Sequence, residues 1–155
     1  MKFNEWLQTV PRELTEDPLW RMEVYRLAVF ANDLAWLDVT KLVQDKRTLE
    51  LSDQLYRAVG SVSANVAEGY SRSSGKDEAR FFEYALGSAR EARGWYYQGR
   101  HILSEGVALH RIQLMTSIIR LLLTMIPAER NRKLREEDAA YQAGLDHLLD
   151  DPPMP

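Results

Sequence analysis

Residues 61–75 read SVSANVAEGYSRSSG, and this stretch decides how the chain divides into helices. Upstream of it, apolar residues recur at the spacing of one helix face, at Leu51, Leu55, Ala58, Val62 and Val66. Gly69 is placed to end this helix, residues 70–75 to form a loop, and Ser74 to cap the next helix. The stretch therefore predicts a turn between two long helices.

Working outward, two more long helical patterns are found, and no stretch alternates apolar and polar residues as a strand would. The first helix is predicted from Asp17-Pro18 to about Gln44, and the second begins after Thr48. The third helix follows Ser74, and the fourth runs from about Val107 to Ile126, with breaks at Gly106 and Pro127.

Each pattern has an apolar face that predicts its packing. The first face consists of Val24, Leu27, Ala31, Leu34, Ala35 and Leu42; the third of Phe81, Ala85, Ser88, Ala92, Trp95, Gly99 and Leu103; the fourth of Ile112, Met115, Ile119, Leu122 and Ile126. These faces predict an all-α, antiparallel up-down four-helix bundle over residues 18–128. An amphipathic N-terminal segment (1–17) and a basic, then acidic, C-terminal tail (129–155) flank it.

The fourth helix carries a second apolar face, formed by Leu114, Ile118, Leu121 and Met125. One face suffices to pack a bundle helix, and exposed leucines in a row favour association. The sequence therefore predicts a homo-oligomer joined through these residues. The alternative is a central helix that one copy buries on all sides.

The flanking segments also have helical spacing. The N-terminal set is Phe3, Trp6, Leu7 and Val10, and the C-terminal set is Tyr141, Leu145, Leu148 and Leu149. Each could dock on a partner or pack on its own domain.

The amino-acid composition limits the kinds of chemical site that this chain can form. The 155 residues are 45% apolar and include no cysteine, which excludes disulfides, thiolate zinc sites and cysteine nucleophiles. Neither a signal peptide nor a continuous membrane span is indicated, so a cytoplasmic protein without membrane partners is expected. The net charge of −3 arises in the tail, because residues 136–155 contain six acidic residues and no Lys or Arg.

Polar residues at the end of the second helix need partners. Asn65 and Glu68 border the apolar stripe, and Glu68 lies at the negative end of the helix dipole. A cation nearby would stabilise this carboxylate, and Arg80 is the best candidate in the sequence. The prediction is a polar motif of Asn65, Glu68, Gly69 and Arg80, with a Glu68–Arg80 contact.

Two segments, SANVAEGYSR and DEARFFEYALGSARE, resemble a known family. The matching residues are Ser63, Asn65, Val66, Ala67, Glu68, Gly69, Asp77, Arg80, Phe81, Ala85, Gly87, Ser88 and Glu91. Residues 20–128 resemble the four-helix-bundle proteins encoded in intervening sequences of bacterial 23S ribosomal RNA genes, and the related accessory variability determinant proteins of diversity-generating retroelements. The resemblance implies a homopentameric ring and a reverse transcriptase as a partner. Leu86 departs from the family pattern, which often has a basic residue there.

Catalytic and metal-ligand constellations are scarce. The three histidines lack metal-ligand spacing, phosphate-loop signatures are absent, and neither an enzyme nor a cofactor is expected. A basic, partly aromatic stripe on the third helix instead suggests RNA or single-stranded DNA, at Arg90, Arg93, Tyr97, Arg100 and His101. A second basic cluster follows the fourth helix, at Arg130, Arg132 and Lys133. The alternatives are an ordinary solvated face and a protein–protein adaptor with no nucleic-acid role.

Overall fold

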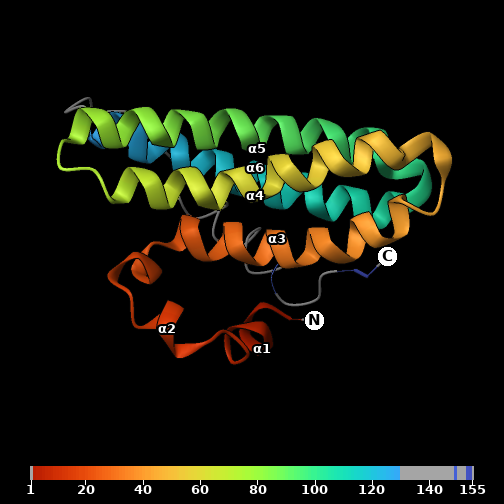
Figure 1. Cartoon of the computed structure of the whole chain (residues 1–155), viewed down its shortest axis with the longest axis horizontal. Coiled ribbons are helices and arrows are strands. Elements are labelled where there is room, and N and C mark those ends of the chain that lie inside the picture. Colours follow the sequence, from red (N-terminus) through yellow and green to blue (C-terminus); the bar gives the residue numbers. More distant parts are fainter. Residues whose placement is uncertain (1, 130–148, 150–152, 155) are drawn as a thin grey trace.

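Four long helices run antiparallel in the computed structural model, which describes residues 2–129, 149 and 153–154. They are α3 (Glu23–Leu42), α4 (Leu49–Tyr70), α5 (Gly75–Leu103) and α6 (Glu105–Glu129). In Figure 1, α4 lies between α3 and α5, and α6 lies behind them. The described residues contain no strand, and the four long helices are those of the predicted bundle.

The N-terminal segment forms a separate layer against the outer side of α3 (Figure 1). It contains α1 (Phe3–Leu7), α2 (Arg12–Thr15) and the 3-10 helix η1 (Pro18–Arg21). Asp17 caps η1 by accepting a hydrogen bond from the Leu19 N–H at 2.8 Å. The prediction that the first long helix starts at Pro18 was therefore wrong by five residues, because this cap starts a separate 3-10 turn and α3 begins at Glu23.

The segment packs on its own bundle. Trp6 is buried among Phe3, Trp20 and Phe30, with ring centroids 5.1–6.0 Å from its own. Its indole N–H donates to Asp33 Oδ2 at 2.6 Å. Of the two roles left open for this segment, the structure shows packing on its own domain.

The bundle core contains most of the predicted apolar residues, but the face of α5 is shifted. Phe82 and Tyr96 are fully buried, whereas Phe81 and Trp95 are half-buried at the edge facing α4. The prediction placed Phe81, Ser88 and Trp95 in the core because their seven-residue spacing fits a helix stripe. Ser88 instead donates to Ser61 Oγ of α4 at 3.0 Å, which identifies this stripe as an edge.

Both faces of α6 are used within one copy. Leu114 and Ile118 have 0% exposure, while Leu121 and Met125 are half-buried against the core. The prediction that these four residues form an exposed oligomer interface was therefore wrong for Leu114 and Ile118. Within one copy, α6 packs mainly against α5 and also against α3.

The break between α5 and α6 lies at Ser104, not at Gly106 as predicted. Ser104 has φ 92°, a backbone conformation that favours glycine. Its N–H donates to the Arg100 carbonyl and its own carbonyl accepts from Ala108, so it ends one helix and begins the next. The prediction that the fourth helix stops before Pro127 was also wrong, because α6 continues to Glu129. Pro127 lies in the last described turn, where it removes one backbone hydrogen-bond donor.

An ion pair in the core joins α3 to α6. Arg111 donates to the two oxygens of Asp38 from Nε at 2.7 Å and from Nη2 at 3.1 Å, and the side chains are 1% and 0% exposed. Tyr96 of α5 donates to Asp38 Oδ2 at 3.1 Å. Burial raises the pKa of Asp38, while the hydrogen bond and charge of Arg111 oppose that rise. Because a guanidinium only donates, His110 Nδ1 accepts from Arg111 Nη1 at 2.9 Å.

Gly69 does not end the second helix, because α4 continues to Tyr70. Its role is a close approach to α5: a Cβ at this position would lie 2.9 Å from Phe82 Cε1 and 3.1 Å from the Glu78 carbonyl oxygen. The predicted C-terminal glycine is thus a packing glycine in the last turn of α4.

This contact gives a stability prediction. An exposed helical Gly→Ala change stabilises by about 0.5–1 kcal/mol, and Gly94→Ala should do so because no atom lies within 4 Å of its Cβ position. Gly69→Ala should instead lower the free energy of unfolding by about 1 kcal/mol, because overpacking costs about 1–3 kcal/mol. Urea unfolding of both variants measures the difference. Equal stabilisation by both would show that Phe82 moves aside freely.

Candidate nucleic-acid interface

The predicted basic stripe lies on the outer side of α5. Arg90, Tyr97 and His101 are exposed, and Arg93 and Arg100 are half-buried. Arg90, Tyr97 and His101 lie on the side of the helix away from the buried Ala92 and Tyr96, whereas Arg93 and Arg100 lie at the border of the buried side. The structure therefore brings the predicted residues of α5 together on one surface.

This surface extends onto α6. Arg93 Nη1 donates to Thr116 Oγ1 of α6 at 3.3 Å, so the stripe follows the edge between the two helices. Arg120 is exposed one helical turn after Thr116. We name Arg90, Arg93, Arg100, Arg120 and Tyr97 the α5–α6 basic face. Arg120 was missed from the sequence, although its polar position beside Thr116 was a usable signal.

The arginines of the α5–α6 basic face have no carboxylate partner within the described part of the chain. Four of the eight other described arginines do form ion pairs: Arg47 with Asp45, Arg57 with Asp53, Arg72 with Glu68, and Arg111 with Asp38. The charge of the α5–α6 basic face is therefore free to act on an external anion.

Tyr97 and Arg100 form a stacked pair in this face. The Arg100 guanidinium carbon lies 4.0 Å from the Tyr97 ring centroid, and Nη1 donates to the Tyr97 carbonyl oxygen at 2.7 Å. Tyr97 is nevertheless 58% exposed. Together they present a planar cation and an aromatic ring, two groups on which a nucleobase can stack.

The predicted polar motif is arranged differently from expectation. Glu68 pairs with Arg72 one turn later, and Arg80 Nε donates to Tyr84 Oη at 2.8 Å. The predicted Glu68–Arg80 contact was therefore wrong, because Glu68 is exposed and Arg72, in the loop just after α4, pairs with it. Asn65 Nδ2 donates to the Ser61 carbonyl at 2.8 Å, close to the α4–α5 contact.

The second basic cluster and most of the acidic tail belong to the part of the chain that the structure does not describe. Arg130, Arg132 and Lys133 lie outside the described residues, as do Tyr141, Leu145 and Leu148; Leu149 packs against the core. Among the residues that are described, no three His, Asp or Glu side chains are grouped to hold a metal ion.

By length and composition, α6 is one helix apolar enough to cross a membrane. Its position explains this composition, because it packs against α3 and α5 and carries the buried Arg111. A core helix passes the same test.

Comparison with known proteins supports a family assignment. The family model described as 23S rRNA-intervening sequence protein matches residues 21–124, which include all of α3, α4 and α5 and most of α6. No curated protein and no solved structure matches the chain. The match covers more than half of the sequence and coincides with the bundle, and the chain therefore belongs to the 23S rRNA-intervening sequence protein family.

Proposed function

We propose that this protein is a non-enzymatic, homo-oligomeric scaffold that binds RNA or single-stranded DNA through the α5–α6 basic face. The observation that carries the proposal is a set of four arginines along one helix pair that have no carboxylate partner among the described residues. The family description, which refers to an intervening sequence of 23S rRNA, supports an RNA-related role.

The spacing of the arginines suits a strand lying along α5. Arg90 and Arg100 are ten residues apart, which corresponds to about 15 Å of helix. Arg93 lies between them, so three guanidinium groups can contact successive phosphates. Such contacts release counterions and make affinity depend strongly on salt.

The Tyr97–Arg100 pair adds a sequence-tolerant contact. Stacking of a base on an aromatic ring contributes about 1–3 kcal/mol and is available to every base. A single strand exposes its bases for this contact, whereas a duplex keeps them stacked inside. The α5–α6 basic face therefore favours single-stranded ligands over duplexes.

The test compares two triple variants that lose the same charge. Arg90→Gln/Arg93→Gln/Arg100→Gln should weaken binding to a labelled 20-nucleotide RNA at least about tenfold at low salt. It should also reduce the magnitude of the slope of log affinity against log salt concentration by about 2, because each lost phosphate contact on a single strand contributes roughly 0.7. Fluorescence anisotropy between 50 and 200 mM salt measures both quantities.

The matched control is Arg12→Gln/Arg47→Gln/Arg72→Gln, which removes three charges from other surfaces. It should retain most of the affinity and the salt slope. Equal losses in both triple variants, or no binding by the parent protein at low salt, would contradict the proposal.

A reverse transcriptase is the protein partner that the family resemblance implies. Co-expression of the two proteins followed by co-purification at moderate salt tests this partner separately. Association that survives nuclease treatment would show direct protein contact, and its loss would show a bridge of nucleic acid.

A further inference from the structure

One continuous ridge on the surface of α5 has the same residue types at both of its ends. Its members follow one another at spacings of three or four residues, so each is a surface neighbour of the next. All of them are exposed except Arg100, which is half-buried. We name this set the α5 ridge: Arg80, Tyr84, Gly87, Arg90, Gly94, Tyr97 and Arg100.

Each end of the α5 ridge is a pair of arginine and tyrosine side chains. At the C-terminal end, the Arg100 guanidinium carbon lies 4.0 Å from the Tyr97 ring centroid. At the N-terminal end, the Arg80 guanidinium carbon lies 5.7 Å from the Tyr84 ring centroid, and Nε donates to Tyr84 Oη at 2.8 Å. Tyr84 and Tyr97 are 46% and 58% exposed, so both rings keep a surface on which a base can stack.

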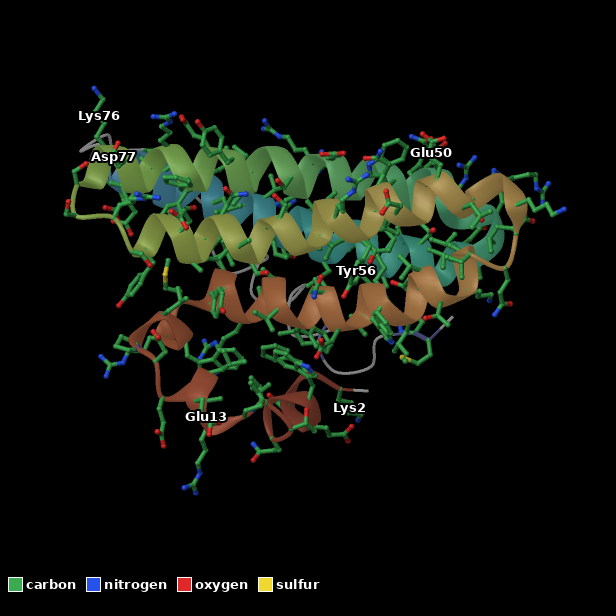
Figure 2. All side chains as sticks on the ribbon, in the orientation of Figure 1. Lys2, Glu13, Glu50, Tyr56, Lys76 and Asp77 are labelled. Carbon is green, nitrogen blue, oxygen red and sulfur yellow. The ribbon has the colours of Figure 1, made fainter. Side chains whose placement is uncertain are left out.

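The Tyr84 end is held in place by neighbouring rings and has a further cation beside it. The rings of Tyr84 and Phe81 meet edge to face with centroids 5.6 Å apart, and the Arg72 guanidinium carbon lies 4.5 Å from the Phe81 centroid. Lys76 is exposed and extends away from the bundle at the start of α5 (Figure 2). It precedes Arg80 by four residues and adds positive charge at this end.

The middle of the α5 ridge leaves room for a ligand. No atom lies within 4 Å of the Cβ position at Gly87 or Gly94. A glycine lets the backbone of a ligand come close to the helix. Arg90 lies between the two glycines, and it has no ion-pair partner among the described residues. A strand that crosses the glycines therefore meets a cation halfway.

Three carboxylates flank the α5 ridge and oppose phosphate groups near them. Asp77 accepts from the Ser74 hydroxyl at 3.1 Å, and Glu91 accepts from the Trp95 indole at 3.2 Å. Glu83 is the third, next to Tyr84 in the sequence. Positive charge alone therefore does not hold a strand along the whole ridge, and base stacking at its two ends is the main additional contact.

The separation of the two tyrosines sets the length of strand that can reach both. Tyr84 and Tyr97 are 13 residues apart, which corresponds to about 20 Å of helix. Stacked nucleotides follow one another at about 3.4 Å along a strand. About six stacked nucleotides therefore span the two rings, and an extended strand needs fewer.

We propose that one single strand of RNA lies along the α5 ridge, with one base stacked at Tyr97–Arg100 and a second base stacked at Tyr84–Arg80. The inference rests on the proposed function and extends the α5–α6 basic face towards the start of α5. Because both pairs contact the same strand, the second contact forms at a high effective concentration and strengthens binding.

The test is the variant Tyr84→Ala with labelled oligouridine of about 12 nucleotides as the probe. The variant should bind about tenfold more weakly than the parent protein at low salt, within the range for one lost base stack. The number of strands bound per chain should stay the same, because Tyr97–Arg100 still holds the strand. Fluorescence anisotropy measures the affinity, and a titration at high protein concentration measures the stoichiometry.

Three controls separate stacking from other effects. Tyr84→Phe keeps the ring and loses only the hydroxyl contact with Arg80, so it should bind like the parent protein. Trp36→Ala removes an aromatic side chain that is 61% exposed on α3, and it should leave the affinity unchanged. Unlabelled oligouridine of about three nucleotides is too short to reach both rings, so its affinities for the parent protein and Tyr84→Ala should agree within about twofold.

Unchanged binding of the longer strand by Tyr84→Ala would overturn the inference and leave the proposed function standing. Half as many bound strands at unchanged affinity would also overturn it, because the two pairs would then hold separate strands. An equal loss of affinity in Trp36→Ala would do the same. A parent protein that binds no RNA at low salt would contradict the proposed function itself, and the inference with it.

Discussion

Replacing Arg111 with methionine is expected to lower the free energy of unfolding by about 3–5 kcal/mol, the cost of leaving a buried charge without its partner. Asp38 would keep only the Tyr96 hydroxyl as a donor and would lose the two hydrogen bonds from Arg111. Its carboxylate would then stay in the core unneutralised or take up a proton. Urea unfolding followed by circular dichroism measures the loss.

The double variant Asp38→Leu/Arg111→Met tests whether the loss of stability comes from leaving one charge unpaired in the core. Replacing both partners by apolar groups of similar size is often neutral or stabilising, so most of the loss should be recovered. Arg12→Met, at an exposed arginine, should change the stability by less than about 0.5 kcal/mol. A loss below about 1 kcal/mol in the single variant would mean that water reaches Asp38.

The existence of this ion pair could not be predicted from the sequence. Asp38 and Arg111 are 73 residues apart, and each falls in a helix whose neighbouring positions are apolar. Helical periodicity identifies which face is buried, but it does not identify which polar residues on two distant helices meet. Whether these two side chains come into contact depends on the axial offset of α3 and α6 in the bundle.

The four helices themselves were predictable because their apolar repeats are long. The error on α5 has a local cause: Phe81 and Phe82 are adjacent, as are Trp95 and Tyr96, so two stripes of similar hydrophobicity compete. Tyr96 lies in the core because its hydroxyl donates to Asp38, a contact that only the assembled bundle supplies. The exposure of Arg90 and His101 was predictable, since charged side chains on a helix opposite an alanine-rich face are exposed, whereas Arg93 and Arg100 lie closer to that face and are half-buried.

The predicted oligomer interface on α6 could not be located correctly by counting apolar residues alone. The second face of α6 contains four apolar residues, yet Leu114 and Ile118 are fully buried within one copy. Leu121 and Met125, further along the same face, are half-buried against the core. The exposed fraction of each side chain distinguishes a buried second face from an exposed interface. Sequence periodicity does not give this fraction for a helix with two apolar stripes.

Trp6→Ala is the second variant expected to have a large effect, with a loss of up to about 3–5 kcal/mol from removal of its buried ring contacts. Trp6 contacts three aromatic rings, and its bond to Asp33 is the one hydrogen bond that links described residues 2–16 to α3. Trp6→Phe keeps most of the ring contact and should lose about 1.5–3 kcal/mol, the contribution of a hydrogen bond to a charged group.

The loss on Trp6→Ala has an upper limit, because residues 1–20 lie outside the family match and no described backbone hydrogen bond ties residues 2–16 to α3. Once the layer detaches, further changes within it should cost nothing more. The double variant Phe3→Ala/Trp6→Ala should therefore be about as stable as Trp6→Ala alone, and urea unfolding should still show one cooperative transition for the bundle. Additive losses in the double variant would instead show that the layer and the bundle unfold as a single unit, with Trp6 as part of a core that extends beyond the four long helices.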